Sequence, residues 1–387
     1  MQSAPVFKTP DGKAISEVPA ETLEDLLSAW RRQGVQGWEG SGSLDEFIKN
    51  LELNPKGDWA APQAFKPWAG DAGSPFPVAV KPGSLVPVDQ IFGTYVREPD
   101  WGMDQDICGR QPYPCNPEWK WMEAYADGLP SQAFRHMYWP KGYLKIAKGL
   151  PIPIYVHKPI GQAPARCRLY FQLSVLAADT GHRYWAARFL AWSMHYAQDV
   201  AQPFHAKQIP SRKLMVLSPW PIPNQTETAR KIAYYHLAFE DYMDGYAARL
   251  KGVIAQAPSL GRSGAEAATA AAANFGAAHA AAAADASLSF FPPISKGQLK
   301  ESAPSEEIYR QNKAQDGLTA APPPAFEGIA EECMAEAGGA TRNLLDLFES
   351  QAKIPEPAAV AANSPWTKIR AALSLSRFGL SFDGAAR

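Results

Sequence analysis

The sequence lacks several features that would assign it to common classes of protein. It has no run of about eighteen apolar residues, which argues against a membrane-spanning helix. Lys and Arg number 38 against 39 Asp and Glu, so a formal charge of −1 gives no basic field for attracting nucleic acid. The first residues lack the charged start and apolar core of a signal peptide. If the protein is exported, its signal has been removed or export uses another route.

Cysteine is scarce, with only four residues. Cys108 and Cys115 flank a Pro-rich loop, so a local disulfide between them is one prediction for an oxidising compartment. Cys167 and Cys333 would then be the other pair. The alternative is four unpaired thiols, of which the buried ones behave as small apolar side chains. Their spacing does not suggest a zinc ribbon.

Helical patterns dominate the sequence, and no strand-rich segment stands out. Apolar residues recur at helical intervals on both sides of Gly181, which predicts two helices joined near that residue. Alanine is the best helix former and dominates residues 264–288, which predicts one long helix. We therefore predict a mostly α fold with long irregular loops. Its expected helices cover 20–32, 43–51, 166–206 in two parts, 264–288 and 326–348.

One stretch carries a pattern of metal-binding side chains. His195 and Asp199 are four residues apart on a predicted helix, so both side chains lie on one face. Pro203 cannot continue that helix, so the chain turns there and presents His205 from a new direction. Neutral imidazole and carboxylate are typical Zn²⁺ ligands.

A second pair, His236 and Glu240, repeats the four-residue spacing on another predicted helix. A lone pair of this kind is usually a solvated polar face. Two pairs with a Pro-linked third histidine favour a metal site, because helices that face each other can supply several ligands.

The segment His-Tyr-Ala-Gln-Asp-Val-Ala-Gln-Pro-Phe-His-Ala, residues 195–206, resembles the signature of the zinc-dependent phospholipase C family, roughly H-Y-x-x-D-x-x-Q-P-x-H-A. The same superfamily includes the single-strand-specific zinc nucleases. The resemblance covers about 95–245, with a weaker match near Leu344. It implies a bacterial zinc enzyme whose metals are held between core helices.

The resemblance also implies a ligand set. Relatives carry an Asp upstream of a His that is followed by an aromatic pair, and both bind the first zinc. Asp100 is preferred to Asp104 for this role. By resemblance, one Zn²⁺ is held by Asp100, His136, His195 and Asp199, and another by His205, His236 and Glu240.

A third zinc in relatives uses an N-terminal Trp and a His shortly after it. This chain has no His before His136, so those partners are missing. Asp89 or Asp104 could rebuild such a site with oxygen ligands, which would hold zinc more weakly than imidazole. We expect two tightly bound zinc ions and a labile third metal, if any.

The resemblance implies a phospholipase C that hydrolyses glycerophospholipids such as phosphatidylcholine to diacylglycerol and a phosphorylated headgroup. The metals activate the water that attacks phosphorus, and Asp100 is the candidate catalytic base. The alternative is a zinc-dependent single-strand nuclease or phosphodiesterase. That branch typically has Gly-Gly-Asn after Q-P-x-H and an Asp in the later pair, whereas this chain has Ala206-Lys-Gln-Ile and Glu240. A third interpretation is a zinc-stabilised helical binding protein.

Binding of a choline headgroup would need aromatic faces near the trimethylammonium. Tyr95, Trp139 and Trp220 are candidates because they lie close in sequence to the expected ligands, although such aromatics are more often core. The expected partner is a phospholipid at a membrane surface, contacted peripherally. Nucleic acid is not the expected partner. The protein is expected to be secreted or exported from a bacterial cell.

Three regions are expected along the chain. Residues 1–94 form an N-terminal extension that packs on the core. Residues 95–355 form the zinc-dependent catalytic domain, with an inserted loop at 300–325. Residues 356–387 form a C-terminal tail.

Overall fold

The structure is a computed structural model, and it describes a set of ranges that includes most of the expected site. The described residues are 7–8, 12–35, 82–99, 135–145, 155–207, 209, 231–232, 234–236, 238–240, 242–243, 247–291 and 323–352. Helix makes up 71% of the interpretable residues, which confirms the mostly α fold. The helix expected over 43–51 lies outside the described residues.

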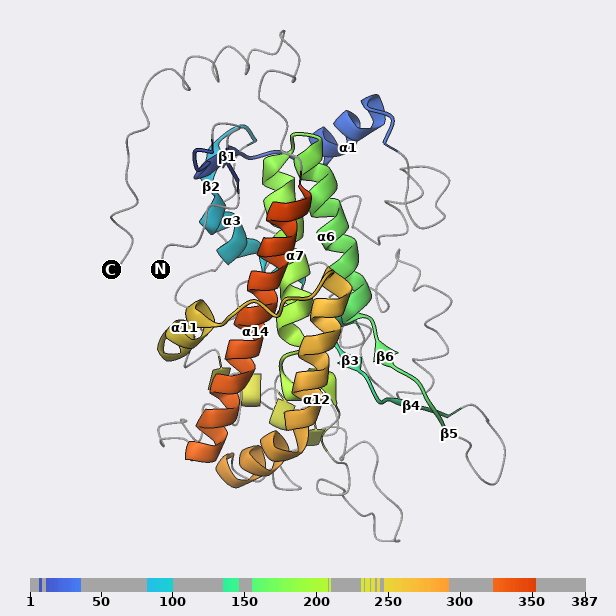
Figure 1. Ribbon diagram of the computed structural model, residues 1–387, viewed down its shortest axis with the longest axis vertical. Helices are drawn as coiled ribbons and strands as arrows, with labels where there is room; N and C mark the ends of the chain where they lie inside the picture. Colours follow the sequence, from blue (N-terminus) through green and yellow to red (C-terminus); the bar gives the residue numbers. More distant parts are fainter. Residues whose placement is uncertain are drawn as a thin grey trace, which may run out of the picture.

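The elements follow one another along the chain in a simple order (Figure 1). The helices are α1 (Leu23–Arg32), α3 (Val88–Tyr95), α6 (Ala163–Asp179), α7 (Arg183–Asp199), α8 (Pro203–Ala206), α11 (Ala247–Gln256), α12 (Ala265–Phe290) and α14 (Pro324–Gln351). The strands are β1 (Glu17–Pro19), β2 (Leu85–Pro87), β3 (Tyr138–Trp139), β4 (Tyr143–Lys145), β5 (Tyr155–His157) and β6 (Ile160–Gly161). They pair antiparallel as β1–β2, β3–β6 and β4–β5.

Helices α6 and α7 form an antiparallel hairpin at the centre, and α12 and α14 lie against it (Figure 1). Gly181 joins the hairpin with a φ of 89°, a left-handed conformation that side chains other than glycine rarely adopt. The sequence predicted this junction correctly. Helix α12 approaches the turn after α7 so closely that a Cβ on Gly276 would lie 2.7 Å from the carbonyl oxygen of Val200. Glycine therefore allows α12 to press against the segment that leads into α8.

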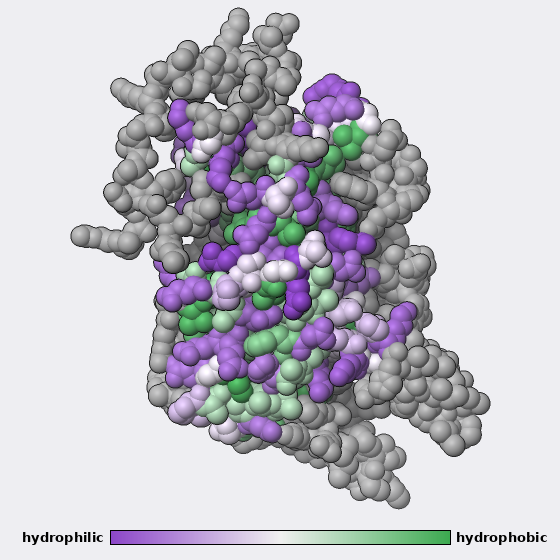
Figure 2. All heavy atoms as spheres, in the orientation of Figure 1, coloured by the Kyte–Doolittle hydropathy of each residue, from purple (hydrophilic) through white to green (hydrophobic). Residues whose placement is uncertain are grey.

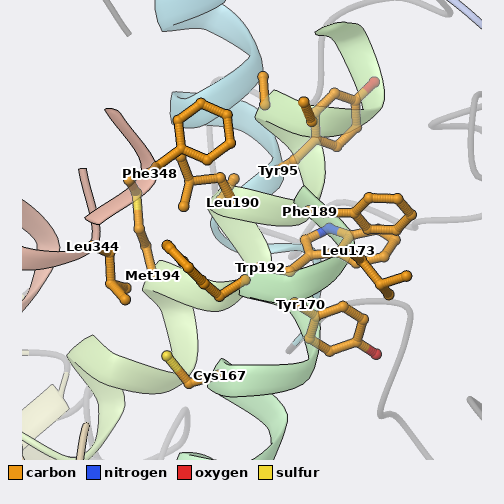
Figure 3. Packing of buried hydrophobic residues seen from close by; sticks show 14 of the residues in the cluster. Tyr95, Cys167, Tyr170, Leu173, Phe189, Leu190, Trp192, Met194, Leu344 and Phe348 are labelled. Carbon is orange, nitrogen blue, oxygen red and sulfur yellow. The ribbon is translucent and has the colours of Figure 1, made fainter. Parts of the chain in front are cut away.

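The main hydrophobic core is rich in aromatic rings along α7. Phe189 packs against Trp185 and Trp192, with ring centroids 5.3 and 5.2 Å away. Leu344 and Phe348 of α14 meet this helix from the opposite side (Figure 3). The aromatic side chains of the sequence thus fill a large core.

The described part of the N-terminal region packs on the same core. Trp30 of α1 is fully buried and stacks against Phe189 at 6.4 Å, and its indole N–H donates to Thr180 Oγ1 at 2.9 Å. Helix α1 begins at a capping box, in which Thr22 and Asp25 satisfy each other's backbone N–H groups. The boundaries of the three expected regions stay a prediction.

The pairing of Cys167 with Cys333 is wrong, because neither residue forms a disulfide. Cys167 lies in the main core beside Ser193, with Sγ 3.2 Å from Oγ, whereas Cys333 belongs to a second hydrophobic cluster. The two thiols are therefore held apart by packing. Cys108 and Cys115 lie outside the described residues.

The face drawn in Figure 2 mixes hydrophilic and hydrophobic side chains over α12 and α14. Among the described residues, Leu85 is the large apolar side chain that is exposed. Every described helix is too short or too polar to cross a membrane.

Candidate metal centre

The C-terminal end of α7 carries two of the expected ligands, His195 and Asp199. This helix is almost entirely buried, and its stripe of Arg188, Trp192, His195 and Asp199 recurs at helical spacing. Helix α7 ends at Asp199, and α8 begins at Pro203, a favoured first helical position because proline has no N–H to leave unpaired. The chain turns at the predicted place.

The first group consists of His136, His195 and Asp199. His136 Nδ1 lies 2.7 Å from Asp199 Oδ2 and 2.9 Å from His195 Nε2. His195 Nε2 lies 3.1 Å from the same Asp199 oxygen. Three potential ligand atoms from two segments, 59 residues apart at the histidines, thus converge on one point. Such a donor set suits Zn²⁺.

The second group consists of His205, His236 and Glu240. His205 Nε2 lies 2.8 Å from His236 Nε2, and both nitrogens lie 2.9 Å from Glu240 Oε1. In each group, the potential ligand atoms all lie within 4.8 Å of one another. Two imidazoles and a carboxylate again make a suitable zinc set.

His136 links the two groups, because its ring belongs to the first and its backbone contacts the second. The backbone carbonyl oxygen of His136 lies 2.9 Å from His205 Nδ1, which donates a hydrogen bond to it. This contact fixes the tautomer of a neutral His205 ring and leaves the lone pair of Nε2 aimed at Glu240 and His236. A lone pair beside a carboxylate oxygen is repulsive unless a proton or a cation lies between them. The space between these atoms therefore suits a positive charge, either a proton or a metal ion.

The charges of the groups reinforce one another. Burial alone would raise the pKa of Asp199, but the neighbouring His195 and His136 outweigh it and hold that pKa well below its usual range. Burial likewise opposes ionisation of Glu240, and His236 and His205 reverse this to lower its pKa. Both carboxylates thus stay ionised, the form that binds a metal.

Aromatic packing holds the rings of the first group. Tyr196 contacts His136 and His195, with ring centroids 5.1 and 5.4 Å away. Tyr170 of α6 stacks on Tyr196 at 5.7 Å, and the Arg166 guanidinium lies over both tyrosine rings. These supporting residues were not identified from the sequence, because they become neighbours only when α6 and α7 pack.

A buried ion pair stabilises α7 two turns before His195. Glu98 and Arg188 are at most 1% exposed, and the carboxylate accepts hydrogen bonds from Arg188 Nε at 2.9 Å and from its Nη2. The indole N–H of Trp192 donates to Glu98 at 2.8 Å, and the guanidinium stacks over the ring of Tyr95 at 4.0 Å. The sequence reasoning missed this pair, whose members are 90 residues apart.

The structure brings six of the seven expected ligands into two groups and leaves Asp100 outside the described residues. Asp104 and Trp220 also lie outside them. Asp89 is exposed in the first turn of α3, where its Oδ1 accepts from the N–H of Gln90, and it belongs to neither group.

The two described aromatics that were candidates for substrate binding have different surroundings. Tyr95 is buried in the main core, and its hydroxyl lies 2.7 Å from that of Tyr184. Trp139 is half-buried on β3, three residues after His136. The N–H of its indole is buried and has no hydrogen-bond partner among the described residues. Unlike Tyr95, Trp139 is not part of the main hydrophobic core.

Comparison with known proteins gives little further information. No protein-family model matches the sequence, and no curated protein gives a significant match. Among solved structures, the chain is similar to the alpha-toxin of Clostridium perfringens from avian strain SWCP, at 13% identity and a TM-score of 0.27. The match covers 72% of this chain and 57% of the toxin chain. This similarity is too distant to carry an argument, so the functional conclusion depends on the side chains of the two groups and on the sequence resemblance of residues 195–206.

Proposed function

We propose that this protein is a zinc-dependent phospholipase C that hydrolyses glycerophospholipids to diacylglycerol and a phosphorylated headgroup. The observation that carries the proposal is the pair of adjacent groups, each with two imidazoles and one carboxylate. The residues that would hold the metals are His136, His195 and Asp199 in the first group and His205, His236 and Glu240 in the second. Zn²⁺ bound there would supply Lewis acidity toward a phosphodiester and lower the pKa of water.

The chain's own residues prepare the site for this chemistry. The His136 carbonyl holds the His205 ring in one tautomer, and Tyr196 packs against the rings of His136 and His195. Ligands that are already held in one orientation need little rearrangement when substrate arrives. Asp100 is proposed as an additional ligand and as the general base, from the resemblance alone.

Two features favour a phospholipid over a nucleic acid. The later pair ends in Glu240, and the segment after His205 reads Ala-Lys-Gln-Ile, both of which resemble the phospholipase branch. The formal charge of −1 offers no basic field for a polyanion. We further propose that Trp139 contacts the headgroup, that membrane contact is peripheral and that the protein acts outside the cell.

A paired release assay tests the proposal. Phosphorylated headgroup would be measured from phosphatidylcholine vesicles, and cleavage would be measured in parallel with a single-stranded DNA oligonucleotide, both with added Zn²⁺. We expect release from the vesicles that is lost in His195→Ala. Cleavage of DNA alone would assign the nuclease function instead. Zinc binding without turnover of either substrate would indicate a zinc-stabilised binding protein.

A further inference from the structure

Gln202 lies in the turn between α7 and α8, and its side chain makes two different kinds of contact. Its Oε1 caps α8 by accepting hydrogen bonds from the backbone N–H groups of Phe204 and His205, the latter at 3.2 Å. Its Nε2 donates to Glu240 Oε1 at 3.3 Å. One amide thus joins the segment that carries His205 to the carboxylate of the second group.

The surroundings dictate the orientation of this amide. Two backbone donors converge on one end of it and a carboxylate oxygen lies at the other. If the amide were reversed, its NH₂ would face two N–H groups and its oxygen would face a negative charge. Only the observed orientation satisfies all the partners, so Gln202 presents a donor to Glu240.

Glu240 is the member of the second group that most needs support. Its side chain is 40% exposed, against 13% for His205 and 26% for His236. A glutamate whose side chain is only partly buried loses considerable rotamer freedom when it is held in one position. The oxygen that receives the Gln202 hydrogen bond is also the one that faces both histidines. The tether therefore acts on the potential ligand atom itself.

We propose that Gln202 is a positioning residue for the second group. It holds Glu240 Oε1 and the segment that carries the His205 ring in the positions in which both can bind one metal ion. It is not itself a ligand, because its oxygen is engaged by the start of α8. The inference rests on the proposed metal-dependent function and goes beyond it by adding a residue that acts through two ligands. Removal of such supporting contacts typically weakens metal affinity about 10–100-fold.

Gln202→Ser separates the tether from the cap. Serine is a favoured helix N-cap, so α8 keeps its acceptor, but the side chain is too short to reach Glu240. Co²⁺ would serve as the probe, with affinity measured from its visible absorption. In a His195→Ala background, where only the second group is intact, we expect Gln202→Ser to lower Co²⁺ affinity about 10–100-fold. In a His236→Ala background, where only the first group is intact, we expect no change.

The matched control is Gln198→Ser, which removes a similar hydrogen bond, from Nε2 to Thr341 Oγ1 at 2.8 Å. It should change Co²⁺ affinity in neither background, and the urea midpoint of metal-free Gln202→Ser should equal that of the parent. Gln202→Thr repeats the test with another capping residue if serine impairs folding. Unchanged affinity in both backgrounds, or an equal loss in both, would overturn the inference while leaving the proposed function intact. An otherwise unmodified chain that binds no Co²⁺ would refute the proposed function, and the inference with it.

Discussion

Replacing Arg188 with methionine would leave the carboxylate of Glu98 buried without its counter-ion. Burial already raises the pKa of Glu98, and Arg188 and Trp192 oppose that rise through charge and hydrogen bonds. In the variant, the carboxyl group would take up a proton rather than stay charged in the core. At pH 7, protonating a carboxyl with an ordinary pKa near 4.5 costs about 3.4 kcal/mol, at about 1.36 kcal/mol per pH unit. Breaking buried ion pairs typically costs about 3–5 kcal/mol, which agrees with this figure.

The sign of the pH dependence follows from the raised pKa. A carboxyl group whose folded-state pKa is raised contributes stability that is complete below its unfolded pKa and is lost as pH rises through the folded value. The loss of free energy of unfolding in Arg188→Met should therefore shrink by about 1.4 kcal/mol for each unit that the pH falls from 7, until the pH reaches the raised pKa that Glu98 has in the parent protein. Urea unfolding of the metal-free protein, followed by tryptophan fluorescence at several pH values, measures both effects.

The double variant Arg188→Met/Glu98→Gln is the control. It removes the stranded charge, and glutamine can still accept the hydrogen bond from Trp192. Replacing both partners of a buried pair with neutral groups is often close to neutral for stability, so the double variant should recover most of the loss. A single variant that loses less than about 1 kcal/mol, or a double variant no better than the single one, would refute the reasoning, because the pair would then lack the desolvation cost that its burial implies.

Four further predictions concern the metals and the thiols. His195→Ala should abolish phospholipid hydrolysis and lower the zinc content measured by elemental analysis; retention of both would contradict the assignment of the first group. Glu240→Gln should lose metal at one site and most of the activity, since an amide is a poor zinc ligand, and full activity with unchanged zinc would reduce this pair to a polar helix face. Elemental analysis after brief dialysis against a mild chelator should find two zinc equivalents, and three would point to a further complete site. Burial raises the pKa of Cys167 to about 11 and that of Cys333 to about 12. Brief alkylation at pH 8 followed by peptide mapping should therefore find both thiols unmodified until the protein is denatured. Rapid labelling of the native protein would show that the thiols are exposed.

Several features of the site could be predicted because they depend on local geometry. In a helix, residues four apart share a face, so the spacing of His195 and Asp199 and that of His236 and Glu240 were sufficient to predict two convergent pairs. Proline cannot continue a helix, which predicted the turn before His205. The position of Gly181 likewise predicted the turn between α6 and α7, because its left-handed φ suits glycine.

Other features were decided only by the tertiary structure, because they join residues distant in sequence. The group of His136 that orients His205 is its backbone carbonyl. Every residue has such a carbonyl, so the sequence could not predict this contact. Gln202 appears in the signature, but its contact with Glu240 exists only because the two segments pack together. The expected pairing of Cys167 with Cys333 failed for the same reason, since residue count could not show that they belong to different clusters. The helical spacing in the sequence thus predicted which ligands share a helix face. The long-range packing of the tertiary structure decided which of these helix faces come together.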